Sequence, residues 1–218
     1  MKGILKMKKY IYTPKSKWKP ALKLVLAIII QMQRKLKKTA NVKITFNWKF
    51  VGSKKKKIIT NIINEPFDFD INLELGKKTK VIDEDRIINL IKKSIPSQIE
   101  KYKIAIHNNK RSISIKILNN DNTTYFKIDF AVTKIKDNKI EILVKDKNSY
   151  IWNVINEKLD KLKIKEKEIK AYKASPLLRD EYIKLKNTDD SLDSYIIYIM
   201  AVNNTLNNIQ NQEKEKNS

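Results

Sequence analysis

Cysteine is absent from this chain, and glycine and proline are scarce: three glycines and five prolines occur among 218 residues. Without cysteine the protein forms neither a disulfide nor a cysteine-ligated zinc site, which suits a reducing compartment. Long apolar runs are also missing. The longest, residues 24–30, is far shorter than the roughly 20 residues that span a membrane as a helix. We therefore expect a cytoplasmic protein with no membrane partner.

Arginine is scarce as well, although the chain is strongly basic. The formal net charge is +23, and proteins this basic attract phosphate-rich partners. RNA or DNA bound through the basic surface is thus a candidate partner. Arginine is the residue preferred for bidentate phosphate recognition, yet it occurs only at Arg34, Arg86, Arg111 and Arg179. The charge therefore indicates tolerance of polyanions more than dedicated recognition, and nothing in the sequence indicates the oligomeric state.

The spacing of apolar residues changes along the chain and indicates its fold class. Hydrophobic residues make up 41% of the sequence, which is enough to bury a core. Alternation of apolar and polar residues predicts strands over residues 42–51, 67–75, 112–118, 124–132 and 139–145. Helical spacing follows Pro20 and returns after residue 151. We predict an α+β fold: a mixed β-sheet core packed with helices, followed by a small helical C-terminal subdomain.

The same patterns divide the chain into segments: a basic N-terminal arm (1–19), the α+β core (20–150), the helical subdomain (151–209) and a polar tail (210–218). Proline is favoured at the first position of a helix, so the first core helix is expected to begin at Pro20. Residues 54–64 are expected to form a short helix or turn. A second helix is expected over about 84–103, interrupted near Pro96. The single histidine, His107, is expected in a loop or on the surface.

Asp68 and Asp70 are the first candidate functional residues. Side chains two apart on a strand point to the same face, so these two carboxylates lie side by side while the other face of the strand is apolar. Paired carboxylates repel each other unless positive charge lies between them, and divalent cations are a common source of it. Asp129 sits in another largely apolar strand. It is expected to complete a metal site with Asp68 and Asp70.

Gly52 and Ser53 form the second candidate feature, at the end of the strand 42–51. Glycine lets the backbone approach a phosphate closely, and the start of a following helix favours anions. The Ser53 hydroxyl adds a hydrogen-bond donor, and Lys54 adds positive charge. We predict that Gly52, Ser53 and Lys54 bind the phosphates of a nucleotide.

Together these residues resemble the polymerase-beta-like nucleotidyltransferase superfamily. In that family a hydrophobic-Gly-(Gly or Ser) turn precedes a strand with the pattern Asp-h-Asp-h-x-h-x-h, where h is hydrophobic, and a later strand supplies a third aspartate. Val51-Gly52-Ser53, residues 68–75 and Asp129 match this pattern. The layout is most similar to the branch of oligoadenylate synthetases and cyclic-oligonucleotide synthases. The resemblance covers about residues 20–145.

The resemblance implies a function as well as a fold. Asp68, Asp70 and Asp129 would be catalytic and would bind two Mg²⁺ (or Mn²⁺) ions, and Gly52 and Ser53 would hold the phosphates of an NTP such as ATP. The implied reaction transfers a nucleoside monophosphate to a hydroxyl acceptor: a nucleotide, an RNA end or a protein. Lys54 stands where the family often has a second glycine. The alternative is therefore a basic nucleic-acid-binding protein with a degenerate nucleotidyltransferase fold.

Overall fold

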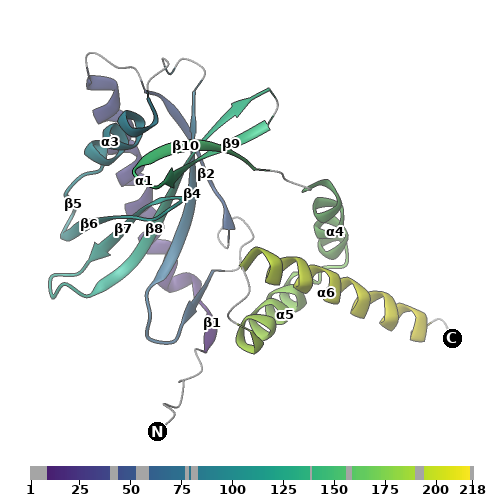
Figure 1. Cartoon of the computed structure of the whole chain (residues 1–218). Coiled ribbons are helices and arrows are strands. Elements are labelled where there is room, and N and C mark those ends of the chain that lie inside the picture. The colour runs from purple at the N-terminus through teal and green to yellow at the C-terminus, as the bar shows by residue number, and fades with distance from the viewer. Residues whose placement is uncertain are drawn as a thin grey trace, which may run out of the picture. The chain divides into compact units, whose positions relative to one another are not determined.

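A computed structural model of the chain describes residues 9–39, 44–52, 59–76, 79, 83–137, 139–155, 159–189 and 194–216. Internal contacts divide the chain into two compact units (Figure 1). The first, called here the sheet unit, comprises Thr13–Ile59 and Pro66–Asn156. The second, called here the helical unit, comprises Met1–Tyr12, Thr60–Glu65 and Glu157–Ser218.

An eight-stranded mixed sheet forms the sheet unit. Its strands are β2 (Phe46–Phe50), β4 (Phe67–Leu75), β5 (Gln98–Ile99), β6 (Tyr102–Asn108), β7 (Ile113–Leu118), β8 (Thr124–Lys136), β9 (Lys139–Asp146) and β10 (Ser149–Ile155). The strand order is β10-β9-β8-β7-β6-β5, and β4 pairs with both β8 and β2. Among the described strands only β4 and β8 run parallel to each other. The predicted α+β class with a mixed sheet is confirmed.

Two helices, α1 (Lys15–Lys38) and α3 (Glu84–Ser94), complete the core of the sheet unit. They contact each other and bury their apolar sides in one cluster with alternate residues of the central strands. Its fully buried members include Ile28, Ile91, Phe69, Phe126 and Phe130. The burial of one face of each central strand leaves the polar side chains of β4 and β8 on the opposite face.

The start of α1 differs from the prediction. The helix begins at Lys15 and contains Pro20 in its interior, so it overlaps the segment predicted as an arm over residues 1–19. The backbone N–H groups of Lys17 and Trp18 donate to the carbonyl of Pro14, at 2.9 and 3.4 Å. The Trp18 ring packs against the hydrophobic core. Packing of this ring explains why the helix extends ahead of Pro20, since tertiary contacts outweigh local propensity.

Two helix predictions are wrong in part. The helix expected over residues 84–103 ends at Ser94, and β5 and β6 follow. Pro96 lacks a backbone N–H and ends the helical ladder. The helix expected from residue 151 begins only at Leu159, because β10 continues to Ile155. Trp152 anchors β10, with the Lys134 Nζ 4.0 Å from its ring centroid.

The helical unit contains α4 (Leu159–Ala171), α5 (Ser175–Thr188) and α6 (Ser194–Lys216), together with a ribbon of β1 (Tyr10–Tyr12) and β3 (Thr60–Ile62). Thus residues 60–62 of the predicted helix or turn are a strand, and α6 extends into the predicted polar tail. Asn187 fastens β1 to α5: its Oδ1 accepts from Tyr10 N at 2.6 Å and its Nδ2 donates to Tyr10 O at 3.1 Å. No described helix is both long and apolar enough to cross a membrane.

Candidate functional site

The alternation of β4 fixes the direction of Asp68 and Asp70. Phe67, Phe69 and Ile71 are buried in the core, which turns the two aspartates to the opposite face, where they are half-buried. A shift of the strand by one residue would exchange the two faces and bury the carboxylates. The hydrophobic core therefore sets the register of these two side chains.

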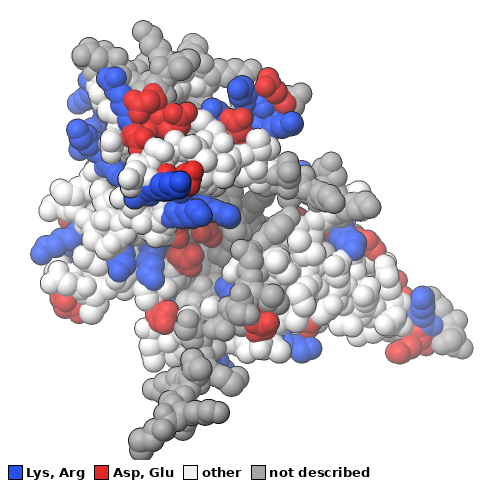
Figure 2. All heavy atoms as spheres, viewed as in Figure 1, with Lys and Arg blue, Asp and Glu red and all other residues white. Residues whose placement is uncertain are grey.

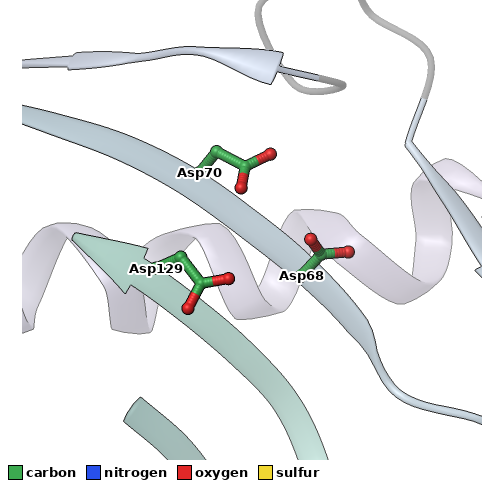
Figure 3. Close-up of side chains that lie close together, drawn as sticks. All are labelled: Asp68, Asp70 and Asp129. Carbon is green, nitrogen blue, oxygen red and sulfur yellow. The ribbon is translucent and has the colours of Figure 1, made fainter. Parts of the chain in front are cut away.

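Parallel pairing with β8 brings Asp129 to the same place. In the β4–β8 register Asp129 lies beside Asp70, and Figure 3 shows the three carboxylates gathered over the two adjacent strands. One oxygen from each of Asp68, Asp70 and Asp129 lies within 4.8 Å of the others. Carboxylate oxygens are preferred ligands of hard divalent cations. The cluster thus fits a divalent-metal site built from the aspartates that the sequence singled out.

Gly52 lies against this cluster at the end of β2. The neighbouring Val51 N donates to Asp70 O at 2.9 Å, and Gly52 has a φ of +54°, in the left-handed region that glycine tolerates best. A Cβ at this position would collide with the Asp70 carboxylate. Glycine therefore suits this position both by its backbone conformation and by the space that it leaves beside Asp70. Ser53 and Lys54, the other predicted phosphate ligands, lie outside the described residues.

Sequence reasoning missed two hydrogen-bonded residues, one of which contacts the cluster. Ser114 on β7 lies directly opposite Asp129 in register, and its hydroxyl donates to Asp129 Oδ1. The Asn109 amide donates in turn to Ser114 Oγ at 2.6 Å. The alternation of residues 112–118 places Ser114 on a polar face, but it does not show which strand lies beside β7.

Positive charge lies next to the carboxylates on the same face of the sheet. Lys127 neighbours Asp68 in the β4–β8 register, and Lys116 lies directly opposite Lys127 on β7. Like charges that face each other across two strands are destabilising, so an anion near this pair would stabilise it. His107 lies opposite Ser114 on β6 and is exposed. It is a surface residue, as predicted, but it belongs to a strand.

The sheet unit is thus a mixed sheet with helices on one face and three convergent aspartates on the other. Comparison with known proteins shows which fold this is. No protein-family model and no curated protein matches the chain. The cyclic AMP-GMP synthase DncV of Vibrio cholerae, in complex with the linear intermediate 5′ pppA(3′,5′)pG, is similar with a TM-score of 0.59 and 14% identity, over 89% of this chain and 68% of that one.

Two further structures agree. The GTP-bound form of Vibrio cholerae DncV has a TM-score of 0.53 and 15% identity, over 88% of this chain and 52% of that one. The CD-NTase CdnG of Bradyrhizobium diazoefficiens in complex with GTP has a TM-score of 0.51 and 13% identity, over 68% and 41%. The chain thus spans about half the length of these two proteins. It has the polymerase-beta-like nucleotidyltransferase fold, which confirms the resemblance seen in the sequence.

Proposed function

We propose that this protein is a Mg²⁺- or Mn²⁺-dependent nucleotidyltransferase. It would transfer a nucleoside monophosphate from an NTP to a hydroxyl acceptor and release pyrophosphate. The observation that carries the proposal is the convergence of Asp68, Asp70 and Asp129 within 4.8 Å on the polar face of the sheet. The acceptor classes considered are a nucleotide, an RNA end and a protein hydroxyl.

Each aspartate has a separate role in this proposal. Asp68 and Asp70 would hold two divalent ions, and Asp129 would share the ion on the side of the acceptor. Bound there, the ions would neutralise charge that develops on the transferred phosphoryl group. Asp129 would also orient the acceptor hydroxyl and take its proton. Gly52 would let the backbone approach the donor's phosphates, with Ser53 and Lys54 as further phosphate ligands.

Two observations support an NTP as the donor. The similar proteins DncV and CdnG were solved with GTP bound, which makes a nucleoside triphosphate the natural candidate for a site in the same fold. The opposed pair Lys116 and Lys127 also places positive charge beside the carboxylates. Phosphate oxygens near this pair would relieve the repulsion between its two charges.

The direct test uses the full chain with each radiolabelled NTP in turn, with Mg²⁺ or Mn²⁺ and with nucleotide, RNA and protein acceptors. We expect labelled product that EDTA abolishes and that the double variant Asp68→Asn/Asp70→Asn no longer forms. The control is Asp137→Asn in the turn after β8, where φ is +49° and asparagine is well tolerated. It should retain turnover. Turnover by the double variant at the wild-type rate would remove the two aspartates from the mechanism.

The alternative, a basic nucleic-acid-binding protein with a degenerate site, has one observation in its favour. Helix α1 contains no acidic residue, and Arg34, Lys35 and Lys38 line a cavity of about 340 Å³ next to Ser94. Against it, Figure 2 shows basic side chains interspersed with acidic ones on the face in view. Salt-sensitive binding of RNA or DNA that persists in EDTA, without NTP turnover, would favour this alternative.

A further inference from the structure

A chain of hydrogen bonds leads from a surface turn to the third aspartate. The Asn109 Nδ2 donates to Ser114 Oγ at 2.6 Å, and Ser114 Oγ donates to Asp129 Oδ1. We propose that Asn109 and Ser114 are positioning residues that hold the Asp129 carboxylate in its metal-binding orientation. The inference rests on the proposed function, because it assigns a role within the same metal centre.

The direction of the two hydrogen bonds follows from the chemistry of the three groups. A serine hydroxyl has one proton to donate and can accept through its lone pairs, whereas an amide nitrogen only donates. Ser114 Oγ accepts from Asn109 and therefore keeps its own proton for Asp129. One carboxylate oxygen, Oδ1, is then engaged by the hydroxyl, and Oδ2 is left for a cation.

Backbone hydrogen bonds hold the turn in which this network begins, although the turn lies at the surface. Asn109 is the first residue of the turn between β6 and β7. Its backbone N–H donates across the turn to Ser112 O at 3.0 Å. The same turn is also bonded to β9, because Lys145 N donates to Lys110 O at 2.7 Å. The Asn109 side chain thus starts from a backbone that is fixed on both sides.

Such support matters because the three carboxylates repel one another. Without a restraint, Asp129 would turn away from Asp68 and Asp70 when no cation is present. A hydrogen bond to an ionised carboxylate is stronger than one between neutral groups. It therefore keeps the ligand in place before the metal arrives. Residues that orient metal ligands in this way typically change metal affinity by about 10–100-fold when they are removed.

A second network, with threonine in place of serine between an asparagine and an aspartate, provides a matched control. In the turn between β7 and β8, Asn119 Nδ2 donates to Thr123 Oγ1 at 2.9 Å, and Thr123 Oγ1 donates to Asp121 Oδ1 at 2.6 Å. The hydrogen bonds that the Thr123 hydroxyl and the Thr123 backbone N–H donate to the carboxylate lower the pKa of Asp121. The network is exposed and does not include any of the clustered aspartates, so its loss should not change metal binding.

The experiment measures Mn²⁺ binding to the full chain without nucleotide, by titration calorimetry or electron paramagnetic resonance. We expect Ser114→Ala to weaken Mn²⁺ binding by about 10–100-fold and Asn109→Ala to weaken it less. Ser114→Thr, which keeps the hydroxyl, should restore most of the affinity. Thr123→Val should bind Mn²⁺ as the wild type does. With an NTP present, Ser114→Ala should lower kcat more than it changes the KM for the NTP.

Three results would overturn the inference. Wild-type affinity in Ser114→Ala would show that the hydroxyl does not position Asp129, while leaving the proposed function intact. Absence of Mn²⁺ binding by the wild type would overturn the inference together with the metal centre. Covalent nucleotide on Ser114, seen by intact mass after incubation with an NTP, would make this serine an acceptor and not a positioning residue. Asn109 lies in a surface turn, where a substitution is less disruptive to folding. Asn109→Ala therefore tests the same hydrogen-bond network if Ser114→Ala folds poorly.

Discussion

Asp129→Asn removes one of three negative charges while it keeps the size of the side chain and an oxygen for Ser114 to donate to. The chosen oxygens of the cluster lie no more than 4.8 Å apart. At that distance two unit charges repel by about 0.9 kcal/mol in a water-like medium and about 3.5 kcal/mol at an effective dielectric constant near 20. The aspartates are half-buried and Lys127 offsets part of the repulsion. We therefore expect the metal-free variant to be more stable than the wild type by about 1 kcal/mol.

The same substitution should have the opposite effect when metal is present. A ligand at a hundred times its dissociation constant stabilises the folded state by about 2.7 kcal/mol. The wild type should gain this stabilisation from Mn²⁺, and Asp129→Asn should lose most of it. Thermal unfolding followed by circular dichroism, in EDTA and in Mn²⁺, measures both effects. A change of 1 kcal/mol shifts Tm by about 2–4 °C in a chain of this size, so the order of the two Tm values should reverse.

The control is Asp137→Asn, which removes the same charge from an exposed turn. The protein already carries a net charge of +23, so the loss of an acidic group there should leave stability unchanged or lower it slightly through overall repulsion. Only within the aspartate cluster should the loss of a negative charge raise Tm. A lower Tm for Asp129→Asn than for the wild type in EDTA would refute the reasoning.

Two further predictions concern glycine and tyrosine. Gly52→Ala should cost about 1–3 kcal/mol in backbone strain. It should also weaken Mn²⁺ binding, because the new Cβ would displace Asp70. The control, Gly76→Ala, crowds the Thr45 hydroxyl and should lower stability without changing Mn²⁺ binding. Equal Mn²⁺ affinities in both glycine variants would contradict this. Burial and a hydrogen bond to a neighbouring carboxylate raise the pKa of Tyr198 above its usual value near 10. The folded state thus holds this proton more tightly, so stability should fall as pH rises above 10. Urea unfolding of Tyr198→Phe should show a shallower fall, and identical pH profiles would rule out this contribution.

The central strands could be predicted from the sequence because burial marks one face of each. Strand β4 has the predicted bounds, residues 67–75, since every second residue from Phe67 to Leu73 is buried. Strands β6 and β10 were missed, and both are largely exposed. A strand that buries little apolar surface leaves only a weak alternation in its sequence. A helix was therefore predicted where the chain continues the sheet.

The residues of the site also differ in how far the sequence predicts them. Asp68 and Asp70 follow from local spacing alone, because two residues of one strand must share a face. Asp129 was proposed from its place in another largely apolar strand and from the family resemblance, and the structure supplies the parallel register that brings it beside Asp70. Ser114 and Asn109 could not be predicted, because their role depends on which strand pairs with β8 and in which register. The alternation of apolar and polar residues within a strand does not show which distant strand pairs with it.

The packing of the sheet also explains how the protein holds three carboxylates together. The aspartates lie on strands whose other face carries Phe69, Phe126 and Phe130, all fully buried. Any movement of the two strands relative to each other would have to disturb this packing, and a close-packed core resists such displacement. The apolar face of the sheet therefore supplies the free energy that holds the charges close. On the polar face, the space beside Gly52 and the hydroxyl of Ser114 are then enough to orient the ligands.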